Sequence, residues 1–164
     1  LCLYWYDYPT ENQLFGIGKK ADEFEIVDRE AMAKVCDSLV ELKKKRQNVY
    51  ITTKTLTALK HFFLNGQRTW KCKALQSFFM IDSLGRVAGC HRNEPVASVL
   101  ELRDVWDSPR LEGLRKKYSG CAQCAYLCYI FYSLHSSVRS NLSVVLDQWK
   151  NVRTLLKSAR AQRI

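Results

Sequence analysis

Closely spaced cysteines are the residues of this chain best suited to chemistry. Three lie in the run Cys121-Ala-Gln-Cys124-Ala-Tyr-Leu-Cys128, and Cys72 and Cys90 precede it. A Cys-x2-Cys pair supplies two thiolates from one turn, and a soft metal ion or an iron–sulfur cluster needs about four from at least two segments. A redox dithiol uses the same spacing but does not need Cys72 or Cys90. The pattern therefore predicts a four-cysteine metal site, with unligated core thiols as the alternative.

A predicted β-hairpin places two of these cysteines. Residues 77–82 and 86–90 are strand-like, and the turn between them contains Gly85, which can adopt the positive φ that a short hairpin loop needs. Cys72 precedes the hairpin and Cys90 ends it. The hairpin can therefore face the later cysteine run.

Helical segments follow the hairpin. Residues 102–106 and 111–118 form two short helical stretches that lead to Cys121. After Cys128, apolar residues recur every three or four positions, which predicts one or two amphipathic helices that end in a basic tail.

Alternating strand-like and helical segments precede the cysteine region. The apolar run 1–6 and the β-branched run 49–53 predict two strands. Asp28 is a good N-cap for a helix that ends in the basic run 43–46, and a second helix ends at Gly66. This order indicates parallel βα units. The first helix is expected to bury the apolar stripe Met32, Val35, Cys36, Leu39 and Leu42. The second helix is marked by Leu56, Leu59, Phe62 and Phe63.

Length and composition limit the class of protein. The chain has 164 residues, 47% of them apolar, which is enough for one sizeable core or two small ones. It has no apolar run approaching the roughly 18 to 20 residues that span a bilayer, so we expect no membrane span. Seven cysteines in a chain of this size favour metal-bound thiolates in a reducing, cytoplasmic compartment over a disulfide framework. The chain starts without Met, which suggests the later portion of a longer protein.

The net charge of +10 does not by itself indicate nucleic-acid binding. The Lys and Arg residues fall in three groups, at 43–46, 115–117 and 150–163, each near the end of an expected helix. The helix macrodipole favours cations there by about 0.3–1 kcal/mol each. We therefore favour solvated helix ends over a phosphate-binding surface.

The cysteine region resembles the twitch or SPASM-type auxiliary-cluster domain of radical S-adenosylmethionine enzymes. Residues 80–87 resemble the "Ile-Asp-x-x-Gly-x-Val" signature of that family, residues 99–106 resemble its leucine-rich segment ending in Val-Trp, and residues 107–111 resemble the helix start that follows. Residues 1–66 are similar in pattern to the last βα units of its partial TIM-type barrel. The resemblance implies an auxiliary [4Fe–4S] cluster held by Cys72, Cys90, Cys121 and Cys124.

The chain also departs from that family. Full SPASM domains carry seven cysteines for two clusters, whereas this region has five, which favours the one-cluster twitch form. Cys128 is then surplus: it could replace Cys121 or Cys124 as a ligand, or be a core thiol. The Cys-x3-Cys-x2-Cys motif for the S-adenosylmethionine cluster is absent. S-Adenosylmethionine and the second [4Fe–4S] cluster would therefore belong to a missing N-terminal part, or the protein is a degenerate relative without that activity.

Three other residues are candidate neighbours of the cluster. His91 could donate a hydrogen bond to it, and Arg86 and Arg92 could tune its potential or meet an anionic substrate, although exposed side chains would explain all three. Four cysteine ligands would close the site and favour electron transfer, whereas three would leave an iron open to substrate.

The sequence thus predicts an α/β chain in three parts: a remnant of a partial barrel (1–69), an auxiliary-cluster domain of one hairpin and helices (70–135), and a basic C-terminal helix (136–164). The expected role is the cluster-binding portion of a radical S-adenosylmethionine enzyme, with an unidentified small-molecule or peptide substrate. The rival is a structural zinc module of a basic nucleic-acid- or protein-binding protein, with nucleic acid the less favoured partner. A third option is that the C-terminal helix docks a partner protein or another copy of the chain.

Overall fold

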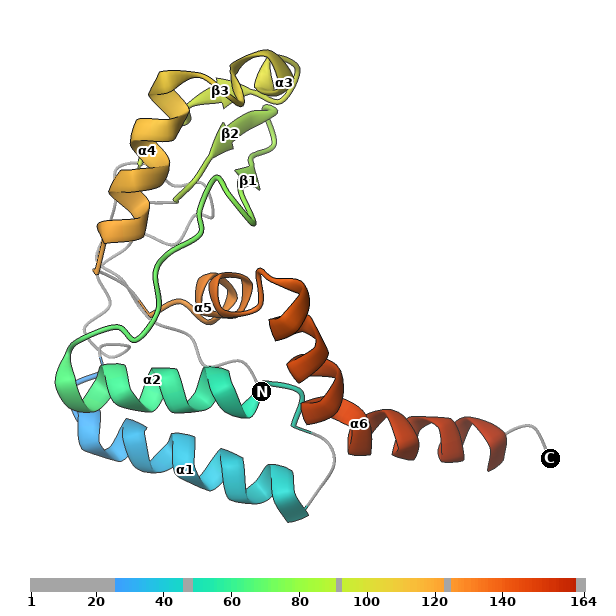
Figure 1. The fold of residues 1–164 in the computed structure, drawn as a ribbon. Coiled ribbons are helices and arrows are strands. Elements are labelled where there is room, and N and C mark those ends of the chain that lie inside the picture. The colour runs from blue at the N-terminus through green and yellow to red at the C-terminus, as the bar shows by residue number, and fades with distance from the viewer. Residues whose placement is uncertain (1–25, 46–48, 91–92, 123–124, 162–164) are drawn as a thin grey trace. The chain divides into compact units, whose positions relative to one another are not determined.

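The structure is a computed structural model that describes residues 26–45, 49–90, 93–122 and 125–161. These residues form six helices and a small antiparallel sheet of three strands (Figure 1). They fall into two compact units: unit 1 is drawn from Val27–Trp70 and Leu134–Ile164, and unit 2 from Lys71–Ser133. None of the described helices has both the length and the apolar content needed to cross a membrane.

Unit 1 is built on two antiparallel helices, α1 (Arg29–Lys45) and α2 (Thr53–Asn65), which pack along each other (Figure 1). Asp28 caps α1, because its Oδ1 accepts a hydrogen bond from the Ala31 N–H at 2.8 Å. Gly66 ends α2 with a φ of 67°, and its N–H donates to the Phe62 carbonyl. Both predicted helices are thus confirmed.

The buried stripe of α1 differs slightly from the prediction. Ala33, Cys36 and Leu39 are buried, whereas Val35 is 37% exposed. The buried positions therefore recur every three residues, the expected burial of Val35 is wrong, and Met32 and Leu42 are only half-buried. On α2, the four apolar positions that marked the predicted helix are all buried: Leu56, Leu59, Phe62 and Phe63.

The strand expected at residues 49–53 is wrong. Thr52 instead caps α2, and its hydroxyl accepts a hydrogen bond from the Thr55 N–H. The Lys43 ammonium donates to the carbonyls of Val49 and Ile51, so these acceptors are satisfied by a side chain and not by a neighbouring strand. Within the described part of residues 1–69 there is no strand, so a barrel is not shown. The other strand, predicted at 1–6, lies outside the described residues.

The C-terminal helix α6 (Val138–Ala161) is attached to α1 and α2 through Asp147. Its carboxylate pairs with the Lys43 ammonium at 2.7 Å and accepts a hydrogen bond from the Thr53 hydroxyl at 2.7 Å. The Lys43 side chain is only 9% exposed, so this ion pair is largely removed from water. Several apolar side chains of α6 are exposed; among those that the structure describes, they are Val138, Leu142, Val145, Leu146, Trp149 and Val152.

A buried histidine lies at the same junction. The Nε2 atom of His135 is 2.9 Å from the Thr52 hydroxyl, and the imidazole is 7% exposed. Burial lowers the pKa of His135, and the charge of Lys54 lowers it further, whereas the Ser140 backbone and the Asp147 carboxylate oppose the shift. Burial in unit 1 therefore favours the neutral form of this imidazole.

We expect unit 1 to lose stability as the pH falls below the ordinary histidine pKa of about 6.5. Unfolded histidine takes up its proton near that pH, whereas folded His135 does so only at a lower pH. Between the two values the unfolded state binds more protons, so acidification lowers the free energy of unfolding until the folded pKa is passed. Urea unfolding at about pH 7.5 and about pH 5, followed through the amide signals of Leu39 and Leu59, measures the change. His135→Gln should flatten this pH dependence and His61→Gln should preserve it; equal slopes in wild type and His135→Gln would contradict the assignment.

Unit 2 contains the sheet β1-β2-β3, in which both pairings are antiparallel. Its elements are β1 (Met80–Ile81), β2 (Arg86–Ala88), β3 (Ala97–Ser98), α3 (Leu102–Val105), α4 (Pro109–Gly120) and α5 (Leu127–Leu134). The predicted hairpin is confirmed, with Met80 opposite Ala88 and Gly85 at a φ of 73°. The Asp82 carboxylate closes the turn by accepting hydrogen bonds from the N–H groups of Leu84 and Arg86. The third strand was not predicted.

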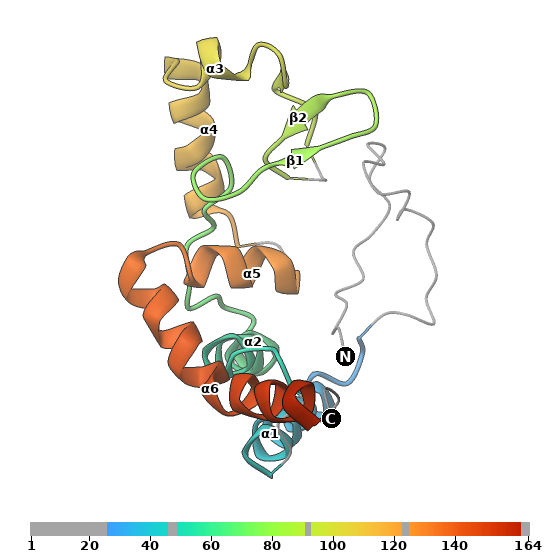
Figure 2. The ribbon, with the colours of Figure 1, turned by 90° about the vertical axis from the view of Figure 1, so that its right-hand side faces the viewer.

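The helix α4 packs against the β2 side of the hairpin (Figure 2). Ser108 caps α4 and Pro109 occupies its first turn, as expected of a helix start. Val87 from β2 and Leu111 from α4 share one buried cluster, and both are almost completely enclosed. This cluster is the core that positions the cysteines.

Candidate metal centre

Two of the predicted ligands lie together in the core of unit 2. Cys72 is 7% exposed and belongs to the same buried cluster as Leu75 and Tyr118. Cys90, which follows β2, is half-buried and packs against that cluster. The segment before the hairpin and the end of the hairpin therefore bring their thiols to one region, as the sequence predicts.

A third predicted ligand, Cys121, reaches this region at the end of α4. Its N–H donates a hydrogen bond to the carbonyl of Tyr118, and its backbone leaves the helical conformation there. Tyr118 lies one turn earlier and is 4% exposed. The last turn of α4 thus connects Cys121 to the buried ring beside Cys72 and Cys90.

The pKa of Tyr118 is affected by burial and by thiol groups. Burial raises the pKa of Tyr118 to about 12, and the thiol groups of Cys90, Cys72 and Cys121 contribute in the same direction. The Asn93 side chain acts in the opposite direction, but no described residue completes a hydrogen bond of good geometry with this buried hydroxyl.

A glycine lets the tyrosine ring lie against the hairpin. A Cβ atom on Gly89 would lie 2.5 Å from Tyr118 Cε2 and 2.9 Å from Leu75 Cγ. Such distances are below van der Waals contact, so only glycine fits at this position without displacing a neighbour. Because Gly89 immediately precedes Cys90, the same close approach sets the position of that thiol.

The remaining predicted residues are placed differently. Cys124, His91 and Arg92 lie outside the described residues. Cys128 lies on α5 and is exposed. The Arg86 guanidinium pairs with Asp82 at 2.6 Å within the hairpin turn. The structure thus gives Arg86 a role in the turn, where sequence reasoning suggested a neighbour of the cluster.

Cys72, Cys90 and Cys121 do not form a completed metal site among the described residues. In the part of the chain that the structure describes, no three His, Cys, Asp or Glu side chains have the arrangement needed to hold a metal ion. The predicted fourth ligand, Cys124, lies outside those residues. The donor set of Cys72, Cys90 and Cys121, gathered from three segments, fits a soft metal ion or an iron–sulfur cluster.

Tyr118 and Gly89 are the residues of this region that sequence reasoning missed. Tyr118 precedes Cys121 by three positions, which is one helical turn, so an aromatic residue at that spacing was a usable signal. Gly89 directly precedes a predicted ligand. A glycine inside a strand pattern is typical of a close backbone approach, which this structure shows.

Comparison with protein-family models, with curated proteins and with solved structures finds no match to this chain.

Proposed function

We propose that this chain is the auxiliary-cluster portion of a radical S-adenosylmethionine enzyme that acts in the cytoplasm. Cys72, Cys90, Cys121 and Cys124 would hold one [4Fe–4S] cluster. S-Adenosylmethionine and the cluster that cleaves it would be bound by another part of the enzyme, because the chain has no Cys-x3-Cys-x2-Cys motif.

The observation that carries the proposal is the packing of Cys72 and Cys90 at one buried cluster that includes Tyr118. Cys121 directly follows the helix of Tyr118, and its N–H donates a hydrogen bond to the Tyr118 carbonyl. The hairpin that resembles the family signature also forms, with Asp82 and Gly85 making its turn. Neither observation depends on the barrel, so the proposal stands on unit 2 alone.

The residues around the thiols indicate what the site would do. A bound cluster would supply a one-electron carrier, with a potential that its surroundings set. Cys72 is buried among apolar side chains, which exclude water from one side of the site. Four thiolate ligands would leave no iron open to substrate, so the site favours electron transfer over substrate binding at the metal.

Metal and sulfide analysis of the anaerobically reconstituted full chain tests this proposal. We expect about four irons and about four sulfides per chain, with broad visible absorbance. About one zinc per chain and no sulfide would instead support the structural zinc module, which uses the same four thiolates. A chain that binds neither iron nor zinc after reconstitution would refute both.

A further inference from the structure

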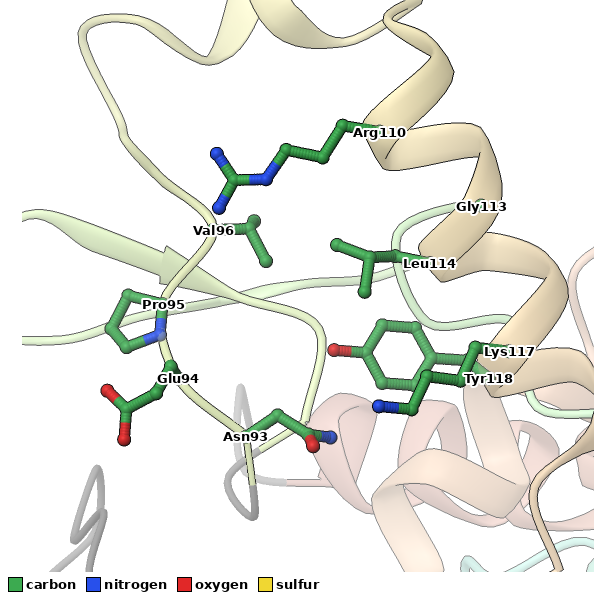
Figure 3. A pocket seen from close by; sticks show the side chains of 9 residues that line it. All are labelled: Asn93, Glu94, Pro95, Val96, Arg110, Gly113, Leu114, Lys117 and Tyr118. Atoms are coloured by element: carbon green, nitrogen blue, oxygen red, sulfur yellow. The ribbon is translucent and has the colours of Figure 1, made fainter.

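A pocket of about 570 Å³ lies between α4 and the segment 93–96 (Figure 3). Val96 and Leu114 give it apolar walls, and all of its lining residues belong to unit 2. Among the described residues, no cysteine lines it. The pocket is therefore distinct from the group of thiols, and Tyr118 is the residue that the two share.

Two cations from one face of α4 line this pocket. Arg110 and Lys117 are seven residues apart, so they lie on the same side of the helix, roughly 10 Å apart along its axis. In the part of the chain that the structure describes, neither forms an ion pair. Their neighbours Arg115 and Lys116 both lie within ion-pair distance of Glu112. The cations that face the pocket are thus the ones that remain available to a ligand.

The position of Arg110 is not explained by helix stability. It lies in the first turn of α4, where the macrodipole disfavours a cation. Lys117, in the last turn, follows the ordinary preference. An anion bound at the start of α4 would pair with Arg110 and would also be favoured by the helix dipole.

The buried phenol supplies a third polar group. Figure 3 shows the Tyr118 hydroxyl directed across the pocket toward segment 93–96. The ring is 4% exposed, and the hydroxyl has no hydrogen-bond partner of good geometry among the described residues. A buried donor left without a partner is destabilising, so a ligand that accepts a hydrogen bond from it is favoured.

We propose that this pocket binds a ligand with two carboxylates, from an acidic peptide segment or a small dicarboxylic acid. Arg110 and Lys117 pair with the two carboxylates, and the Tyr118 hydroxyl donates a hydrogen bond to the ligand between them. Glu94, on the opposite wall, weakens the binding of any anion. This inference rests on the proposed function in one respect only, which is that the ligand would lie beside a metal centre.

Nuclear magnetic resonance titration of the full chain tests the proposal. The probes are the acetylated and amidated peptide Glu-Gly-Gly-Glu, its uncharged counterpart Gln-Gly-Gly-Gln, and glutarate. We expect saturable shifts of the Val96, Gly113 and Leu114 amide signals with Glu-Gly-Gly-Glu or glutarate, and none with Gln-Gly-Gly-Gln. The stronger of the two acidic probes identifies the source of the carboxylates.

Variants separate the contributions of the three groups. Arg110→Gln and Lys117→Gln should each weaken binding by about threefold to fivefold, and added salt should weaken it further. Glu94→Gln should tighten binding by a similar factor. Tyr118→Phe keeps the ring, so it should weaken binding while leaving the ligand-free chain at least as stable.

Absence of saturable shifts with both acidic probes, or equal shifts with the uncharged peptide, would overturn the proposal. Unchanged affinity in the Arg110→Gln/Lys117→Gln double variant would overturn it as well. Iron analysis of the same samples keeps the two hypotheses apart. Full iron loading without binding of an acidic probe rejects only the pocket, and binding of an acidic probe to a chain that cannot be loaded rejects only the cluster.

Discussion

Replacing Cys72 with alanine should remove the iron from the reconstituted chain, from about four irons to below about one, with loss of the visible absorbance. Cys72 is 7% exposed, in the core that also places Cys90 beside Tyr118. An alanine there removes one thiolate and offers no substitute ligand. Cys90→Ala and Cys121→Ala should have the same effect, because they remove the other two proposed ligands that lie in the described part of the chain.

Cys36→Ala is the matched control for these variants. Cys36 is 1% exposed on α1, so it is at least as buried as Cys72, and burial raises its pKa to about 11. A thiol kept protonated in this way is a poor metal ligand. The variant should keep about four irons, although it loses a buried side chain.

Cys128→Ala addresses the surplus cysteine. Cys128 is exposed on α5, whereas Cys72 belongs to the buried cluster against which Cys90 packs. We therefore expect full iron content in this variant. If Cys128→Ala lost its iron while Cys121→Ala retained it, the ligand set would include Cys128 in place of Cys121. Equal iron in wild type, Cys72→Ala and Cys36→Ala would falsify the assignment of the site.

The sequence was sufficient for those elements that local signals determine. Asp28 and Gly66 set helix ends through their own side chains or backbone freedom, and the structure has those ends where expected. Gly85 fixes the hairpin turn in the same local way. The grouping of Cys72 and Cys90 followed from the hairpin, because its two ends must come together.

The incorrect predictions concern segments whose conformation depends on residues that are distant in sequence. The β-branched residues 49–53 have the composition of a strand. However, the Lys43 ammonium donates hydrogen bonds to the carbonyls of Val49 and Ile51, and Thr52 caps a helix. Asp147, which holds that lysine, is more than ninety residues away in sequence, so no local pattern could predict the arrangement. The third strand, Ala97–Ser98, is too short to give a periodic signal.

Substitution of Gly89, which lies against Tyr118 and Leu75, should destabilise unit 2. Gly89→Ala should lower the free energy of unfolding of unit 2 by about 1–3 kcal/mol, and Gly89→Val by more. The added Cβ would lie 2.5 Å from Tyr118 Cε2 and 2.9 Å from Leu75 Cγ, and both neighbours are buried. The ring must therefore move, and because Cys90 follows directly, the variant should also load less iron.

Gly113→Ala provides the control on the same unit. A Cβ on Gly113 meets nothing within 4 Å, and alanine is preferred over glycine inside a helix, so this variant should gain about 0.5–1 kcal/mol. Urea unfolding followed through the amide signals of Val87 and Leu111, both almost fully enclosed, reports on unit 2.

The clash itself is tested by adding Tyr118→Leu to Gly89→Ala. If the Tyr118 ring causes the clash, the double variant should be more stable than the sum of the two single losses predicts. Strictly additive losses would mean that a neighbour other than Tyr118 causes the destabilisation by Gly89→Ala.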